Sequence, residues 1–202
     1  MNTPPYSQSC ENNKAAIATT LVLCFKHASH VLEIGSGTGQ HAVYFAKLLP
    51  HLIWQTSDQR AYHDGINAWI TQAPSDNLRR PLTLDVQHPW PIDHENAAID
   101  AIFSANTLHI MSAEMVEQFF IGVGLHLCHD GDLCLYGPFN YQGQYSSESN
   151  ADFDRWLASQ YSHSAIRDIE WITALANAQQ LKLIQDISMP ANNRLLHFKK
   201  QV

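Results

Sequence analysis

A glycine-rich turn after a short apolar run is the part of this sequence best suited to hold a ligand. The run His30–Ile34 predicts a buried strand, and the turn after it leads into a predicted helix that begins at Gln40. The small residues of the turn are Gly35, Ser36, Gly37 and Gly39. Because glycine has no Cβ, a nucleotide or an amino-acid group can approach the main chain closely here. Glu33, inside the apolar run, is costly to bury alone, and a cationic ligand group at the strand tip would pair with it.

Two further acids follow predicted strands. Asp58 ends the predicted strand 52–57 and lies 19 residues beyond Gly39. An acid at this distance in a nucleotide-binding βαβ unit meets the hydroxyls of a ribose, although Asp58 could also be a helix N-cap. Asp85 follows the predicted strand 81–84. A carboxylate only accepts hydrogen bonds, so Asp85 suits an exocyclic amine such as that of adenine, and a role in a turn is the alternative.

A second set of polar residues is a candidate for binding another reactant. His109 follows the predicted strand 99–105, on the side where open α/β sheets bind ligands. Its ordinary pKa of about 6.5 suits proton removal near neutrality, although a histidine after a strand often only packs. Four side chains further along the chain are candidates to line a pocket, and each has a structural alternative: Tyr136, Tyr141, Asn150 and Arg167. Among them, Arg167 would suit a carboxylate or a phosphate.

The elements that must position these residues alternate regularly. Helical patterns separate five predicted strands, which cover 30–34, 52–57, 81–84, 99–105 and 133–136. A predicted loop spans 86–96, a polar loop spans 140–150, and a final hairpin joins strands 183–189 and 195–199. The order predicts an α/β fold with a doubly wound, mostly parallel, seven-stranded sheet and an antiparallel last strand. At 202 residues and 45% apolar composition, we expect a single domain over 1–202.

Composition excludes several classes of partner. With 12 Lys and Arg against 19 Asp and Glu, and no long basic run, the chain is not expected to bind nucleic acid. The polar N-terminus and the lack of a long apolar stretch predict a soluble, cytoplasmic protein without a membrane partner. Cys24 and Cys134 lie in apolar runs without a CxxC spacing, so we expect small core residues, no disulfide and no metal site. The sequence indicates no oligomeric state.

These residues also carry a family resemblance. The pattern Glu33-x-Gly35-x-Gly37-x-Gly39, the acids Asp58 and Asp85, and the reversed last strand resemble a class I S-adenosylmethionine-dependent methyltransferase over nearly the whole chain. Polar loop segments are similar, more narrowly, to a small methyltransferase-like family of unknown function. These segments are 11–14, 135–139, 149–154, 167–170 and 189–193.

The resemblance implies a Rossmann-like fold, S-adenosylmethionine as the cofactor and a role for each matching residue. Glu33 and the turn from Gly35 to Gly39, Ser36 included, would hold the methionine portion together with Asn106. Asp58 would bind the ribose hydroxyls, and Asp85 with Val86 would contact the adenine. His109 would be the candidate base, and the acceptor is expected to be a small molecule.

Two alternatives remain open at this point. A nicotinamide-dependent oxidoreductase would need a third glycine where this chain has Gln40, and the pyrophosphate of its cofactor would be repelled by Glu33. The other alternative is a protein that keeps the fold, and even the cofactor, as an interaction module without turnover.

Overall fold

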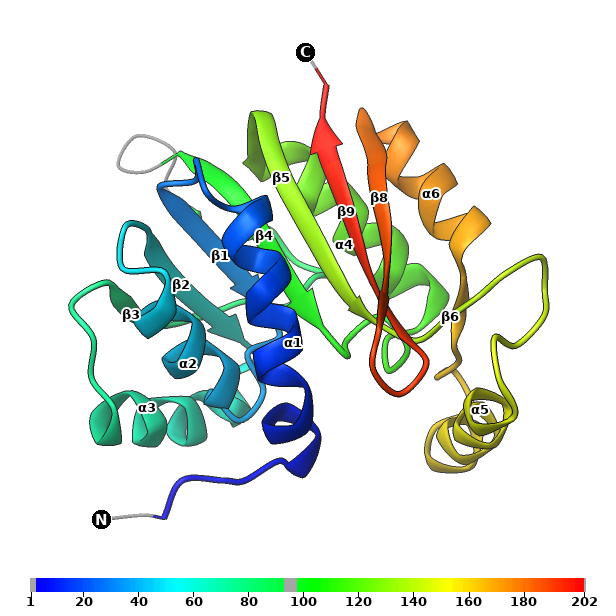
Figure 1. Cartoon of the computed structure of the whole chain (residues 1–202), viewed down its shortest axis with the longest axis horizontal. Helices are drawn as coiled ribbons and strands as arrows, with labels where there is room; N and C mark the ends of the chain where they lie inside the picture. Colours follow the sequence, from blue (N-terminus) through cyan, green and yellow to red (C-terminus); the bar gives the residue numbers. More distant parts are fainter. Residues whose placement is uncertain (1–2, 93–97, 202) are drawn as a thin grey trace.

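The structure, a computed structural model, describes residues 3–92 and 98–201 and is built on one large sheet (Figure 1). The strand order of this seven-stranded sheet is β3-β2-β1-β4-β5-β9-β8. Its strands are β1 (His30–Ile34), β2 (Ile53–Asp58), β3 (Leu78–Thr83), β4 (Ile99–Ala105), β5 (Leu127–Gly137), β8 (Leu181–Met189) and β9 (Asn193–Lys200). Two further short strands, β6 (Phe139–Asn140) and β7 (Arg167–Asp168), pair with each other in a small second sheet.

Helices cover both faces of the large sheet. They are α1 (Gln8–Cys24), α2 (Gln40–Leu48), α3 (His63–Gln72), α4 (Ala113–His126), α5 (Glu148–Gln160) and α6 (Ile169–Ala178), and a 3-10 turn, η1 (Arg60–Tyr62), precedes α3. Buried side chains of α1, α2 and α3 form one core cluster on the sheet, and those of α4 and α6 form another. Figure 1 shows α1 in front of the sheet and α4 behind it. Among the described helices, none has both the length and the apolar character needed to cross a bilayer.

The topology confirms the predicted doubly wound sheet. The strands β1 to β5 pair in parallel, and β9 is antiparallel to both of its neighbours, β5 and β8. The predicted final hairpin is formed by β8 and β9, and its turn places Ala191 and Asn192 in the left-handed region, at φ 55° and 57°. The chain winds outward from β1 to β3 and then returns to β4 beside β1. This reversal creates the crevice in which open α/β sheets bind ligands.

Some element boundaries differ from the predictions. The strand predicted at 81–84 is β3, which begins three residues earlier and contains Pro81. Because β3 is an edge strand, the missing N–H of Pro81 does not interrupt the sheet. The strand predicted at 133–136 is β5, which begins directly after α4, and its pairing with β4 shifts between Ile99 and Ala101. The predicted loop 86–96 lies partly outside the described residues, since 93–97 are not among them.

The predicted polar loop 140–150 is more ordered than expected. It contains part of the short strand β6, a turn closed by main-chain hydrogen bonds between Tyr141 and Gln144, and the first turn of α5. Ser147 is the N-cap of α5, and its hydroxyl accepts a hydrogen bond from the main-chain N–H of Asn150. Pairs of two-residue strands such as β6 and β7 carry too few residues for an alternating pattern to appear in the sequence.

Candidate functional site

The glycine turn after β1 adopts backbone conformations that favour glycine. Gly35, Gly37 and Gly39 have φ values of 75°, 57° and 91°. A Cβ on Gly35 would lie 2.4 Å from Cγ2 of Thr107, so the turn packs closely against the segment after β4. A Cβ on Gly37 would meet no atom within 4 Å. The turn is therefore closed by packing at Gly35 and open to space at Gly37.

Glu33 is buried behind this turn, and its partners come from the protein. Only 2% of the residue is exposed, and its Oε2 accepts hydrogen bonds from Ser36 Oγ at 2.8 Å and Trp54 Nε1 at 3.0 Å. The net effect of the surroundings raises the pKa of Glu33 to about 7: burial raises it most, the two hydrogen bonds oppose the rise, and the charge of Asp58 adds to it. The hydrogen-bond partners of Oε2 thus come from within the chain, and the pairing of Glu33 with a cationic ligand group stays a prediction.

Asp58 joins the end of β2 to the glycine turn. Its Oδ2 accepts a hydrogen bond from the main-chain N–H of Gly37, and its Oδ1 accepts one from Gln59, both at 2.7 Å. Burial raises the pKa of Asp58, while these two N–H groups lower it. The N-cap alternative does not hold, because Gln59 caps η1 and Tyr62 caps α3.

Asp85 and Val86 follow the carboxyl end of β3, at the same end of the sheet as Asp58. Asp85 Oδ1 accepts a hydrogen bond from the main-chain N–H of Gln87 at 3.0 Å, and the Val86 side chain is buried. Asp85 therefore takes part in a turn, and it also faces the cavity described next. Both interpretations of this acid from the sequence are compatible with its position.

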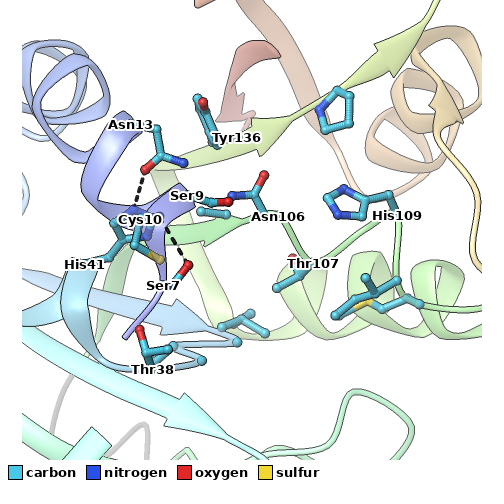
Figure 2. A pocket seen from close by; sticks show the side chains of 18 of the residues that line it. Ser7, Ser9, Cys10, Asn13, Thr38, His41, Asn106, Thr107, His109 and Tyr136 are labelled. Atoms are coloured by element: carbon cyan, nitrogen blue, oxygen red, sulfur yellow. Dashed lines mark hydrogen bonds between the residues drawn. The ribbon is translucent and has the colours of Figure 1, made fainter. Parts of the chain in front are cut away.

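A cavity of about 870 Å³ lies at the carboxyl ends of β1, β2, β4 and β5. The structure brings ten of the predicted site residues together around it: Gly35, Ser36, Gly37, Asp58, Asp85, Val86, Asn106, His109, Tyr136 and Asn150. Figure 2 shows Asn106 and His109 on the same side of this cavity, with Tyr136 above them. Asn106 follows β4 in a left-handed conformation, at φ 58°, and its N–H donates to the main-chain oxygen of Tyr136.

Four predicted site residues are not among those that line the cavity. Glu33 lies behind the turn, and Gly39 serves as the N-cap of α2. Tyr141 donates its hydroxyl hydrogen bond to Asp186 Oδ2 at 2.8 Å, on β8. Arg167 donates to main-chain oxygens in the segment after β4, including that of Met111. Arg167 therefore holds the segment that carries His109, and it is not among the residues that line the cavity.

His109 lies in a largely apolar part of the cavity wall. The residue is 7% exposed, and its ring meets that of Phe153 edge-on at a centroid distance of 5.2 Å. Burial, and then the positive charge of Arg167, lower the pKa of His109 to about 4. The imidazole is therefore neutral at pH 7 and both packs against Phe153 and faces the cavity.

Polar residues from the first turn of α1 and the start of α2 also line the cavity, and none of them was among the site residues predicted from the sequence. These cavity-lining residues are Ser7, Ser9, Cys10, Asn13, Thr38 and His41 (Figure 2). Polar residues before a helical pattern, as at 9–14, can cap the helix or close over a ligand; in the structure this segment contains the start of α1 and also lines the cavity. Ser7 caps α1 by accepting a hydrogen bond from the main-chain N–H of Cys10 at 3.3 Å. Asn13 Oδ1 lies 2.7 Å from His41 Nε2, where it joins α1 to α2.

Gln40, the residue that departs from the nicotinamide fingerprint, holds the N-terminal segment over the turn. Its Oε1 accepts a hydrogen bond from the main-chain N–H of Ser7 at 2.5 Å, and its side chain is buried. A glycine at this position would leave Ser7 without that contact. Gln40 is a polar residue in the first turn of α2, but Gly39 holds the N-cap position. A polar side chain at such a position, without a capping role of its own, was the feature of the sequence that could have predicted this contact.

The Asp, Glu, Lys and Arg side chains among the described residues that line the cavity are all negative. Among the described residues that line it, Asp58 and Asp85 are acidic, and none is Lys or Arg. Such a wall favours a cationic ligand and opposes a pyrophosphate. This distribution disfavours the nicotinamide alternative.

Together, the sheet order, the reversed strand β9 and the glycine turn define a class I methyltransferase-like domain. Solved structures with this fold include an O-methyltransferase family 2 protein from Planctomyces limnophilus in complex with apigenin, with a TM-score of 0.81 and 16% identity over 95% of this chain. Human N-acetylserotonin methyltransferase in complex with S-adenosylmethionine gives a TM-score of 0.79 at 13% identity over 96% of this chain. Mitomycin 7-O-methyltransferase MmcR gives 0.77 at 15% identity over 92%.

This chain corresponds to only 58%, 53% and 53% of those three chains, respectively. A protein-family model matches nearly the whole chain: residues 4–200 match the family described as "Protein of unknown function (DUF938)". The chain belongs to this family.

Proposed function

We propose that this protein binds S-adenosylmethionine and transfers its methyl group to a small-molecule acceptor. The observation that carries the proposal is one continuous cavity whose lining includes Gly37 and Asp58 as well as His109 and Phe153. Its volume of about 870 Å³ is at the upper end of the range for ligand pockets, so it offers room for a cofactor and a second reactant. The fold of S-adenosylmethionine-dependent methyltransferases adds support, and one such neighbour is a complex with this cofactor.

The cofactor end of the cavity fits the chemistry of S-adenosylmethionine. The open space at Gly37 admits a ligand against the main chain, and a side chain there would occupy it. Asp58 offers carboxylate oxygens to ribose hydroxyls, Asp85 beside Val86 offers an acceptor to the adenine amine, and Asn106 lies where the methionine portion would be held. When bound, the cofactor supplies a methyl group on a positively charged sulfonium. The acidic, cation-free wall favours that charge.

The acceptor end of the cavity favours a neutral or cationic molecule. Its wall includes Ile110, Met111 and Phe153, and the one cation predicted for this pocket, Arg167, is bound to main-chain oxygens instead. Among the described residues that line the cavity, an anionic acceptor would therefore find no Lys or Arg to pair with. Methyl transfer mainly requires alignment of the acceptor, the methyl group and the sulfur, which an apolar wall shaped to the acceptor can provide.

His109 would act on the acceptor as a neutral imidazole. Its pKa of about 4 keeps it able to accept a hydrogen bond or a proton at pH 7. A base of such low pKa has little driving force for full proton removal. We therefore assign His109 first to orienting the acceptor by hydrogen bonding, and second to accepting its proton as the methyl group is transferred.

Calorimetric titration with S-adenosylmethionine tests the cofactor assignment. We expect binding, and we expect Asp58→Ala to weaken it at least tenfold, which is about 1.4 kcal/mol. Asp64→Ala is the matched control, because Asp64 is an exposed acid on α3 outside the cavity wall. Absence of binding at millimolar ligand, with the protein folded, would contradict the proposal.

The alternative is a module that binds the cofactor without turnover. Incubation of the protein with a labelled methyl donor and an extract from cells that lack it would separate the two. We expect label in a neutral or cationic small molecule, and we expect less of it with His109→Ala. Binding of the cofactor without transfer to any metabolite or protein would favour the module.

A further inference from the structure

Outside the cavity, three side chains that bind soft metal ions converge between α1 and the sheet. Cys24 ends α1, Cys134 lies on β5 and His197 lies on β9. One potential ligand atom from each residue lies within 4.8 Å of the others. The sequence predicted Cys24 and Cys134 as separate core residues without a metal, because no short spacing connects them with each other or with a histidine. The fold places them together.

The sheet register explains this convergence. Cys134 and His197 are directly opposite each other in the antiparallel pair β5–β9, so their side chains project from the same face of the sheet. The same face carries the core cluster that contains Leu21 of α1, and Cys24 packs against that cluster one turn further along α1. The group of Cys24, Cys134 and His197 is separate from the cavity, because α1 begins at the cavity and runs about 24 Å to Cys24.

The orientation of His197 is the second observation that points to a metal. Its Nε2 lies 2.7 Å from Asp132 Oδ1, and Asp132 Oδ2 accepts a further hydrogen bond from Lys199 at 3.1 Å. The side chains of His197 and Asp132 are 12% and 10% exposed. The other ring nitrogen, His197 Nδ1, is buried, and no side chain or main-chain group of the described residues meets it with the distance and angle of an ordinary hydrogen bond. The side chain of Cys24 interacts with the same ring. A metal-binding histidine characteristically donates its second ring N–H to a carboxylate, as this ring can to Asp132.

We propose that Cys24, Cys134 and His197 bind one Zn²⁺ ion, with Asp132 as the residue that orients the histidine. Two thiolates and an imidazole match the preference of zinc for sulfur and nitrogen ligands, whereas magnesium and calcium require oxygen ligands. Tetrahedral zinc with Zn–S bonds of about 2.3 Å brings two sulfur atoms about 3.8 Å apart. The three ligand atoms already lie within 4.8 Å of one another, so binding needs only small side-chain shifts. With three ligands from the protein, water would supply the fourth.

This site would join the end of α1 to the two strands β5 and β9. The start of α1 forms part of the cavity wall, and β5 leads to Tyr136 there. The role we assign to the ion is therefore structural: it fixes α1 on the sheet. The proposal does not depend on the methyltransferase function.

Cobalt titration of the full-length, reduced and metal-free protein tests the site directly. Co²⁺ bound by thiolates gives a charge-transfer absorption that water-bound Co²⁺ lacks, and Zn²⁺ should remove it by displacement at one equivalent. We expect Cys24→Ser and His197→Gln each to weaken zinc binding at least a hundredfold. We expect Asp132→Asn to weaken it by about tenfold to a hundredfold, as second-sphere changes do. Cys128→Ser is the matched control, because Cys128 also lies on β5 but outside the cluster.

Three results would overturn the proposal. One is the absence of a thiolate–cobalt band in folded, reduced protein. Another is an equal loss of binding in Cys128→Ser and Cys24→Ser. The third is a Cys24–Cys134 disulfide on mild oxidation in a protein that binds no metal when reduced, which would make the two thiols a redox pair. Circular dichroism of each variant checks that it is folded. Cys134→Ser is left out of the test, because a hydroxyl at this fully buried position could destabilise the fold by itself.

Discussion

Glu33→Gln offers a quantitative test of how the glycine turn is held. The carboxyl is buried behind the turn and receives hydrogen bonds from Ser36 and Trp54 on one oxygen. Glutamine keeps the shape of the side chain and an oxygen that can accept both hydrogen bonds, but it has no ionisable group. The substitution therefore isolates the cost of burying a negative charge at this position.

The magnitude follows from the pKa of Glu33. Burial raises it from an ordinary value of 4.5 to about 7, so the folded protein binds this proton more tightly than the unfolded chain does. The contribution of Glu33 to stability is thus fully present below pH 4.5 and is lost as the pH rises through about 7. Between pH 5 and pH 8 the loss amounts to about 2.5 kcal/mol, a loss that glutamine does not undergo.

Urea unfolding of both proteins at intervals from pH 5 to pH 8 measures this effect. We expect the free energy of unfolding of Glu33→Gln to rise relative to the unsubstituted protein by about 2.5 kcal/mol over the range. All other titrating groups are common to both proteins, so they cancel in the difference. Glu117→Gln, at an exposed position on α4, controls for the change in net charge.

A difference that stays constant with pH would refute the reasoning. It would mean that Glu33 has the same ionisation in the folded and unfolded states, so burial and the two hydrogen bonds would offset each other. Cofactor titration of the same variant adds a second criterion. Because Glu33 lies behind the turn, we expect Glu33→Gln to weaken S-adenosylmethionine binding less than Asp58→Ala does.

Three further predictions concern other parts of the site. Gly37→Val should weaken S-adenosylmethionine binding at least tenfold by calorimetry, because the side chain would enter the cavity, and strain at φ 57° should lower stability by about 1–2 kcal/mol. Arg167→Met should lower the free energy of unfolding in urea by about 1–3 kcal/mol, since the main-chain oxygens of Leu108 and Met111 lose a donor; an unchanged midpoint would contradict this role. Burial lowers the pKa of His41 to about 4, so its contribution to stability is lost as the pH falls from 6.5. His41→Gln should therefore lose about 2 kcal/mol less than the unsubstituted protein between pH 7 and pH 5, and equal losses would show that His41 is not buried in its neutral form.

The glycine turn shows how far local reasoning extended into the site. Glycines at alternate positions after an apolar run predicted a close backbone approach, and the three positive φ values confirm the conformations that this requires. Asp58 and Asp85 were predicted because each follows a strand, at the end where open α/β sheets bind ligands, and both line the cavity. The residues of α1 were not predicted as site residues, since the polar side chains of a first helical turn look the same whether they cap the helix or face a ligand.

Glu33, Tyr141 and Arg167 mark the limit of that reasoning. Each was a candidate to bind a ligand, and for Tyr141 and Arg167 a structural role was the alternative. Each instead has partners within the protein: Trp54 and Ser36 for Glu33, Asp186 for Tyr141, and main-chain oxygens for Arg167. A sequence shows that a buried charge or hydroxyl needs a partner, but it does not show which strand supplies it.

By itself, the sequence determined the order of elements, the doubly wound sheet with one reversed strand, and the turn that faces the crevice. These follow from hydrophobic periodicity and from the backbone freedom of glycine, which are local properties. The tertiary structure decided which side chains meet. In the structure Glu33 is buried, and Arg167 is not among the residues that line the cavity. Cys24, Cys134 and His197 come together from three different elements. Such encounters depend on strand order and register, and no short-range pattern in the chain encodes them.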